Sequence, residues 1–302
     1  MSVISPLNHS GCNNSISPVF NIDERMDELR QKIHKFGTRL GISQRILEEC
    51  TLSFDSFSLD CGMNSLRNII LVPPWFLFHY EDIPAQFRVT DLLDPRVSDH
   101  QFLNDLADWM NEKISAAGLT SLCRQVDFWV LQKVIVQLSD SNLSELSKDF
   151  GIAHEMAHLA HWREIQDPYI WGISISIIFL ALTLVLLPFA QITLTLAGIG
   201  IAMGVSSAST LINLFHIYGP TSLSGIEKEK KADLDGARAM NDASGAIFYF
   251  SIALIHNIAT RISHPSLSDI IDANGNDLRD TSHPPFSERI AYLRAWQSEN
   301  SH

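Results

Sequence analysis

The sequence predicts a mainly helical α+β domain that is interrupted by a pair of membrane-spanning helices. Three observations lead to this prediction. Residues 168–226 contain no Asp, Glu, Lys or Arg, an uncharged run of 59 residues. An HExxH pattern precedes this run at 154–158, and an ExxxD pattern follows it at 229–233. We therefore expect both patterns to belong to one domain, with the uncharged run between them crossing the membrane and returning to the same side.

Composition limits the classes of function. The chain has 302 residues with 22 Lys and Arg against 34 Asp and Glu, a net charge of -12. Binding of nucleic acid needs a cationic surface, so we expect no nucleic-acid partner. Hydrophobic residues make up 46% of the chain and charged residues only 19%, below the roughly 25% that is usual for soluble domains. Apolar residues must therefore be concentrated somewhere.

The N-terminal region carries little information. Residues 1–20 are rich in Ser, Asn and Pro, lack the pattern of a signal peptide, and are predicted to be a disordered tail. The four cysteines, Cys12, Cys50, Cys61 and Cys123, form no CxxC pair. Such sparse cysteines favour a reducing compartment.

The uncharged run predicts a transmembrane helical hairpin over 169–218. Its first arm, Tyr169–Leu187, has 19 residues, and its second arm covers about 191–215. About 20 apolar residues cross the hydrocarbon layer as a helix. Pro188 leaves only a short turn between the arms, so both ends of the hairpin lie on one side. The alternative is a buried hairpin in a large soluble core.

Charges next to the hairpin predict its orientation. Arg163 precedes it, and Lys228, Lys230 and Lys231 follow it, whereas its tip carries no positive charge. The positive-inside rule places both flanks in the cytoplasm. A third apolar stretch, 243–260, contains His256 and Asn257 and is predicted to be a helix buried in the domain.

The HExxH pattern predicts a metal site on a helix. Asn142 and Glu145 resemble a capping box that starts this helix. His154 and His158 then lie one turn apart on one face and can bind one zinc ion, with Glu155 beside the bound water as general base. The alternative is a pair of helix histidines that bind no metal.

A catalytic zinc ion needs a third protein ligand. His161 lies about 10 Å along the helix from His154, too far to share one ion. Glu229 and Asp233 of the ExxxD pattern lie on one face of a helix that the hairpin returns to the same side. We therefore expect Glu229 to complete the ligand set and Asp233 to orient a ligand histidine.

Three blocks of sequence resemble the membrane zinc metallopeptidases that include the HtpX heat-shock protease and the CAAX prenyl endopeptidases. The blocks are HEMAH at 154–158, EKKADLDGARAM at 229–240 and SHPPFSERIAYLR at 282–294, and the likeness extends over about 140–295. It implies a zincin-like metallopeptidase domain with one Zn²⁺ per chain. It also implies that His283 and Arg289 stabilise the oxyanion of the transition state, where preorganised donors have large effects. His264-Pro265 lacks an arginine six residues later and is interpreted as a turn.

These observations predict an integral membrane zinc endopeptidase with a protein or peptide substrate and a catalytic domain on the cytoplasmic side. The domain consists of 21–168 and 219–302, with a helix near 101–117 and a small sheet from 69–72 and 128–136. An edge strand of this sheet is expected to align the extended substrate beside the zinc ion.

Two other functions stay open. Leu234-Asp235-Gly236 resembles the LDG ligand motif of site-2-type intramembrane metalloproteases, although charged residues flank the HExxH pattern here. A catalytically inactive membrane adaptor of the same fold is the second alternative. The sequence leaves open the substrate, the oligomeric state and whether manganese replaces zinc.

Overall fold

The computed structural model describes residues 21–54, 61–64, 68–89, 94–116, 128–186 and 225–300. The predicted N-terminal tail and the predicted second hairpin arm, with the turn at Pro188, lie outside these residues. The helices, 3-10 helices and strands in chain order are α1 Ile22–Arg39, α2 Gln44–Glu49, β1 Thr51–Phe54, β2 Gly62–Asn64, β3 Ile69–Val72, η1 Pro74–Leu77, η2 Tyr80–Asp82, η3 Ala85–Phe87, η4 Pro95–Ser98, α3 His100–Ala116, α4 Phe128–Gln137, α5 Ser141–Leu186, α7 Gly225–Met240, α8 Ser244–Ser263, η7 Pro265–Asp269 and α9 Phe286–Asn300.

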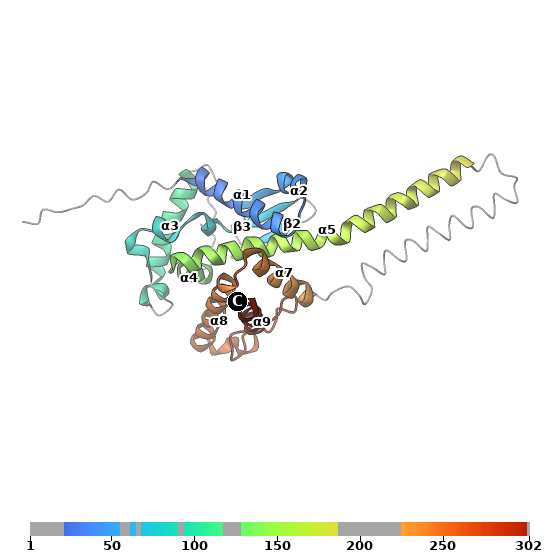
Figure 1. Ribbon diagram of the computed structural model, residues 1–302. Coiled ribbons are helices and arrows are strands. Elements are labelled where there is room, and N and C mark those ends of the chain that lie inside the picture. The colour runs from blue at the N-terminus through green and yellow to red at the C-terminus, as the bar shows by residue number, and fades with distance from the viewer. Residues whose placement is uncertain are drawn as a thin grey trace, which may run out of the picture.

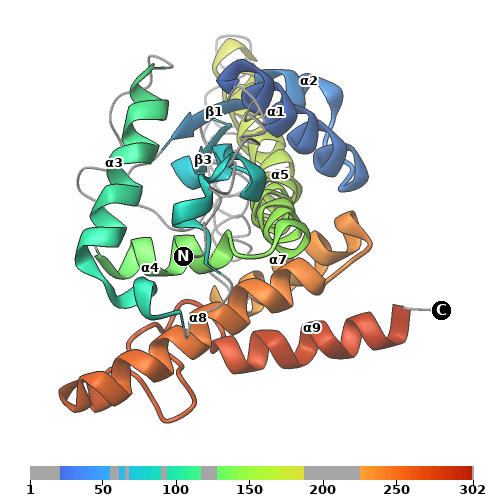
Figure 2. The same cartoon turned by 90° about the vertical axis from the view of Figure 1, so that its left-hand side faces the viewer.

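Helix α5 is the axis of the molecule. The sheet and α1–α3 lie on one side of it, and α7, α8 and α9 lie on the other, so segments from both sides of the uncharged run pack against the same helix (Figures 1 and 2). α4 contacts α3, α5 and α8. Asp140 begins α5, because its carboxylate accepts the backbone N–H of Leu143 at 2.8 Å. The predicted capping box at Asn142 was therefore wrong by two residues, since both Asn and Asp can cap a helix.

The sheet is small and mixed. β3 lies in the centre, parallel to β1 and antiparallel to β2, with Ile70 opposite Leu52 and Met63. The predicted strand at 69–72 is confirmed as β3, where Ile70 and Val72 are buried and alternate with less buried neighbours. β2 is an outer strand of this sheet and contacts α5.

The second predicted strand, 128–136, was wrong, because these residues form helix α4. A short apolar run is compatible with the two-residue period of a strand and with the 3.6-residue period of a helix. The β-branched residues Val134, Ile135 and Val136 favoured a strand. All three are buried in the structure. α4 contacts α3, α5 and α8, so tertiary packing supports the helix. The helix predicted near 101–117 is confirmed as α3.

The C-terminal helices form a second packed cluster against α5. Phe150 of α5, Phe250 of α8, and Ile290 and Leu293 of α9 are buried together. Among the described residues one helix, α8, is long and apolar enough to cross a membrane. It nevertheless contacts α4, α5 and α9, and the 3-10 helix η7 follows at Pro265, where the sequence predicted a turn.

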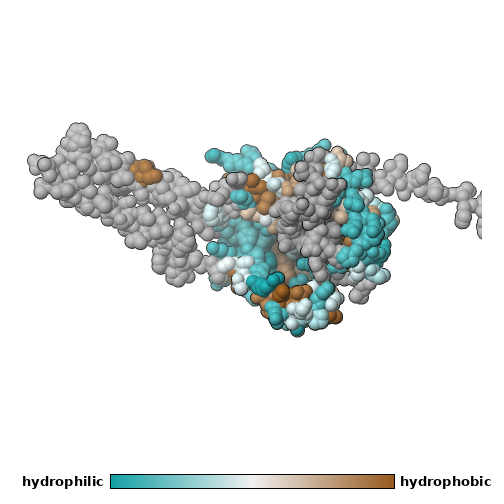
Figure 3. Space-filling model, turned by 180° about the vertical axis from the view of Figure 1, so that it is seen from behind, coloured by the Kyte–Doolittle hydropathy of each residue, from teal (hydrophilic) through white to brown (hydrophobic). Residues whose placement is uncertain are grey.

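Beyond the domain α5 continues as a single projecting helix (Figure 1). It has 46 residues, or about 69 Å at 1.5 Å per residue. The HExxH helix and the first predicted membrane arm are therefore one element, which continues through Pro168. Ile177 and Ile178 on the projecting part are 61% and 57% exposed. By contrast, the globular part shows largely hydrophilic residues on the face seen in Figure 3.

A network of buried charges attaches α1 to α5. The ammonium of Lys148 is buried and donates to Glu145 Oε1 and to the carbonyl oxygen of Phe78, both at 2.6 Å. Lys32 of α1 lies 3.1 Å from Glu145 Oε2 and 2.8 Å from Asp149 Oδ1. Burial alone would raise the pKa of Glu145, but the charges of Lys148 and Lys32 outweigh it and lower this pKa to about 2.

Replacement of Glu145 by Gln is expected to lower stability at pH 7 by about 2 kcal/mol, because Lys148 stays buried without its nearest carboxylate. In the wild type the unfolded chain binds the proton of Glu145 first as the pH falls. Stability is therefore lost between about pH 4.5 and pH 2, and the variant should lose less of it there. Thermal unfolding of the full chain in detergent, followed by circular dichroism at several pH values, measures both effects. Glu299→Gln at the exposed end of α9 is the control, and an identical acid profile for Glu145→Gln would contradict the prediction.

Candidate metal centre

The close crossing of α5 and α7 positions the site. A Cβ atom on Gly236 would lie 3.1 Å from the backbone nitrogen of His154 and 3.2 Å from its Cα, so glycine allows the two helices to touch here. Glu229 and Asp233 precede Gly236 by seven and three residues, and this spacing places all three on one face of α7. The crossing therefore directs both carboxylates at the HExxH segment of α5.

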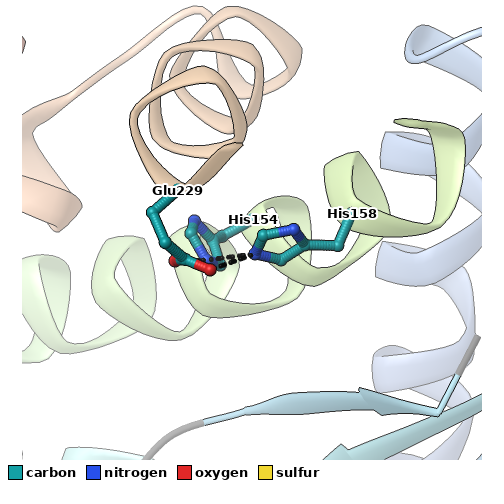
Figure 4. A group of neighbouring side chains, drawn as sticks. All are labelled: His154, His158 and Glu229. Atoms are coloured by element: carbon teal, nitrogen blue, oxygen red, sulfur yellow. Dashed lines mark hydrogen bonds and ion pairs between the residues drawn. The ribbon is translucent and has the colours of Figure 1, made fainter. Parts of the chain in front are cut away.

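His154, His158 and Glu229 converge on one point (Figure 4). The Nε2 atoms of the two histidines are 3.0 Å apart. Oε2 of Glu229 lies 3.3 Å from Nε2 of His154, and Oε1 lies 3.2 Å from Nε2 of His158. The three residues predicted as metal ligands are thus brought together by two helices that are far apart in sequence.

The distances between these atoms fit a tetrahedral zinc site. With zinc bonds of about 2.0–2.2 Å, two ligand atoms in tetrahedral geometry lie roughly 3.3 Å apart. The three observed separations of 3.0–3.3 Å are close to this value. Two histidines and one glutamate are also a donor set of catalytic zinc sites, in which water takes the fourth position.

Electrostatics favour a cation in this cluster. Burial alone would raise the pKa of Glu229, but its contacts with His154 and His158 hold the pKa of this carboxyl well below its usual range. Burial alone would lower the pKa of His154, but Asp233 and Glu229 outweigh it and raise this pKa to about 10. Both carboxylates therefore stabilise positive charge where the imidazoles meet.

Asp233 connects His154 to the C-terminal helix. Its carboxylate is fully buried, and Oδ1 lies 2.9 Å from Nδ1 of His154. Arg289 donates to it from Nε at 2.7 Å and from Nη2 at 2.5 Å, and the Tyr292 hydroxyl donates to the same carboxylate. Burial alone would raise the pKa of Asp233, but His154 and Arg289 lower it to about 2. Asp233 is thus a buried anion beside Nδ1 of His154, held by donors from α9.

The other predicted catalytic residues lie around this cluster. Glu155 is largely buried, with Oε1 4.0 Å from Nε2 of His154. His283 is 43% exposed, and its Nε2 lies 3.6 Å from Oε2 of Glu229 while its Nδ1 lies 2.9 Å from Oδ2 of Asp280. Arg289 is committed to Asp233 through two nitrogens, a contact that the sequence did not suggest.

Two residues considered as alternative ligands pair elsewhere. Nε2 of His161 lies 2.8 Å from Oδ2 of Asp235, and Asp235 also accepts from Arg238. Neither belongs to the group formed by His154, His158 and Glu229. The predicted exclusion of His161 agrees with this geometry, and Asp235 lies outside the group as well.

Sequence reasoning missed Tyr292. Like Arg289, it belongs to α9 and donates to Asp233. It lies three residues after Arg289, so both side chains leave the same face of the helix. This spacing is the one feature of the sequence that relates Tyr292 to Arg289. It indicates a role for Tyr292 only when Asp233 is known to contact both residues.

Residues 130–297 match peptidase family M48, 168 of the 302 residues. The chain belongs to this family. Membership in M48 implies zinc-dependent metallopeptidase activity and a protein or peptide substrate. The match includes α5 and α7, which carry the three residues of the cluster, and most of α9, whose Arg289 contacts Asp233. Neither a curated protein nor a solved structure matches the chain significantly.

Replacement of Tyr292 by Phe is expected to lower zinc affinity about tenfold, because Asp233 loses one donor and orients His154 less firmly. The aromatic ring stays, so the fold should be kept. Zinc affinity is measured by competition with a fluorescent chelator, with Tyr80→Phe in η2 as control. Equal affinity in all three proteins would show that Arg289 alone fixes Asp233.

Proposed function

We propose that this M48 member is an integral membrane zinc endopeptidase of the HtpX and CAAX prenyl endopeptidase type. The observation that supports it most is the convergence of His154, His158 and Glu229, with Glu155 at the same place. Sequence blocks that contain these residues resemble that type of enzyme. One zinc ion per chain is proposed, although manganese could bind the same donors.

Each side chain of the site has its own role in the proposed reaction. Zinc held by His154, His158 and Glu229 supplies a Lewis acid and lowers the pKa of water towards ~7. Glu155 would take the proton of the attacking water and then pass it to the leaving amine as the C–N bond breaks, so that water hydrolyses the peptide bond without a covalent bond to the enzyme.

Two more side chains support the reaction from the C-terminal part of the chain. His283 stands at the open side of the cluster, where its Nε2 can donate to the carbonyl oxygen as charge develops. Arg289 was predicted to share this task. Its two donations to Asp233 favour a positioning role for it, through Asp233 and the ring of His154.

The proposed substrate lies in extended form along β2. This outer strand contacts α5, and Cys61, the residue before it, borders the cavity beside the metal ligands. Main-chain pairing with an outer strand binds extended peptides without regard to most side chains. Peptides with N-methylated backbone positions should then bind at least tenfold more weakly than their parents, and equal binding would rule out this mode.

The membrane part of the proposal rests on α5 and the uncharged run. α5 leaves the domain as a continuous helix, and exposed Ile177 and Ile178 suit a lipid environment better than water. We propose that the hairpin 169–218 spans the bilayer and that the catalytic domain, 21–168 and 219–302, faces the cytoplasm. In a variant whose four native cysteines are replaced by serine, a single cysteine introduced at Gln191, near the predicted tip, should react with an impermeant maleimide from outside the cell only. Labelling from the cytoplasmic side would reverse the topology.

The test of activity uses the full chain in detergent with β-casein as substrate. Cleavage should stop when the protein is treated with 1,10-phenanthroline and return when zinc is added. A folded, zinc-loaded protein that leaves casein and a peptide library intact would favour the inactive adaptor. The site-2-type alternative is not favoured, because Asp235 is engaged by His161 and Arg238.

A further inference from the structure

A cavity of about 110 Å³ opens directly beside the metal ligands. His154, Glu155 and Glu229 form one end of it. Its volume is similar to that of the engineered apolar cavity of about 150 Å³ that holds one benzene molecule. The space therefore suits a single large side chain.

The walls of the cavity are mainly aromatic. Phe76 of η1, Phe150 of α5, Phe250 of α8 and Phe286 of α9 come from four elements and meet around it. Phe150 and Phe250 pack edge to face at 5.8 Å between centroids, and Phe250 stacks on Phe286 at 5.9 Å. These mutual contacts fix the walls, so the cavity is formed before any substrate arrives.

Two polar side chains on the walls, Arg289 and Ser147, are already engaged. The guanidinium of Arg289 lies over the Phe250 ring at 4.0 Å and donates twice to buried Asp233. The hydroxyl of Ser147 donates within α5, 3.0 Å from the carbonyl oxygen of Ser144. The carboxylates of Glu155 and Glu229 repel an acidic side chain at the end near the metal. An apolar side chain therefore has the smallest desolvation cost on entering the cavity.

Gly151 sets the width of the cavity below Glu155. The two residues are four apart on α5 and share one face. A Cβ atom at Gly151 would lie 3.2 Å from Cζ of Phe76 and 3.3 Å from Sγ of Cys61, closer than side chains normally pack. A methyl group at this position would push its neighbours aside or fill part of the cavity.

We propose that this cavity is the specificity pocket of the enzyme. It binds one bulky apolar side chain, aromatic or branched aliphatic, of a residue next to the scissile bond, and Gly151 determines how large that side chain can be. This inference rests on the proposed peptidase function. It names the class of peptide that the site selects.

The experiment begins with one bond of β-casein that the wild type cuts. Peptides spanning it carry Phe, Leu, Ala or Glu at each flanking position in turn. At one position the wild type should prefer Phe or Leu over Ala by at least ~10-fold in kcat/KM, and Glu should be the poorest. Gly151→Ala should reduce the ratio of Phe to Ala peptide about tenfold. Phe286→Leu, which widens the pocket, should raise cleavage of a Trp peptide relative to the Phe peptide.

Binding separates this inference from the function on which it rests. Fluorescein-labelled peptides of one fixed sequence, chosen without reference to cleavage and carrying Phe, Leu, Ala or Glu at a single central position, are titrated with zinc-loaded Glu155→Gln with and without Gly151→Ala. Preferential binding of the Phe peptide that Gly151→Ala abolishes supports the pocket even if no bond is cut, in which case only the proposed function fails. Cleavage or binding with no preference, or with a preference that Gly151→Ala leaves intact, would overturn the pocket and leave the peptidase function standing.

Discussion

Replacement of Glu155 by Gln is expected to lower kcat/KM for peptide hydrolysis by at least ~100-fold and to leave the zinc content unchanged. The amide has the shape of the carboxylate but cannot accept the proton of the attacking water. Glu155 is largely buried with Oε1 4.0 Å from Nε2 of His154, so water at the metal would lie within its reach. His154, His158 and Glu229 are untouched by the change, and the metal should therefore stay.

The measurement is kcat/KM on the casein-derived peptide together with zinc content by mass spectrometry. Glu227→Gln is the matched control, because Glu227 is an exposed carboxylate in the first turn of α7, two residues from Glu229. It should keep wild-type activity and zinc. A Glu155→Gln protein that still hydrolyses peptide at the wild-type rate would assign the general base to another group.

The convergence of the three proposed metal ligands could be predicted from sequence because most of their placement is local. The 3.6-residue period of a helix places His154 beside His158 in any fold. The same period places Glu229 and Asp233 on one face of α7. Only the meeting of the two helices is non-local, and the charge-free run suggested it by returning the chain to the same side of the membrane. The role of Gly236, which allows the two helices to touch, is seen only in the structure.

The contacts that surround the ligands could not be predicted in the same way. Arg289 and Tyr292 reach Asp233 across more than 50 residues of sequence, and no pattern in either segment specifies that pairing. The strand expected at 128–136 was wrong for a related reason. α4 packs against three other helices, and these tertiary contacts outweigh the strand preference of its β-branched residues.

The boundary of the membrane segment shows a different limit. Charge and length indicated a helical arm that starts near Tyr169, and α5 extends to Leu186, close to its predicted end. The predicted boundary between the domain and this arm lies between residues 168 and 169. In the structure one helix carries both the HExxH segment and this arm. Any tilt of the arm would therefore be transmitted to the metal ligands.

Replacement of Glu229 by Gln is expected to weaken zinc binding at least ~100-fold, while Asp235→Asn, a matched change two turns from it on the same helix, keeps the metal. Glu229 contacts both ligand histidines, at 3.3 and 3.2 Å, and an amide offers zinc neither charge nor an equivalent donor. Asp235 pairs with His161 and Arg238, so its loss should cost only stability. Zinc content after dialysis against a chelator measures both variants, with His158→Ala as a second ligand variant that should also lose the metal. Loss of zinc from Asp235→Asn with retention in Glu229→Gln would assign the third ligand to Asp235 and support the site-2-type arrangement. Retention of zinc in both variants would show that the bound zinc does not depend on this cluster, and His154 and His158 would then be structural residues.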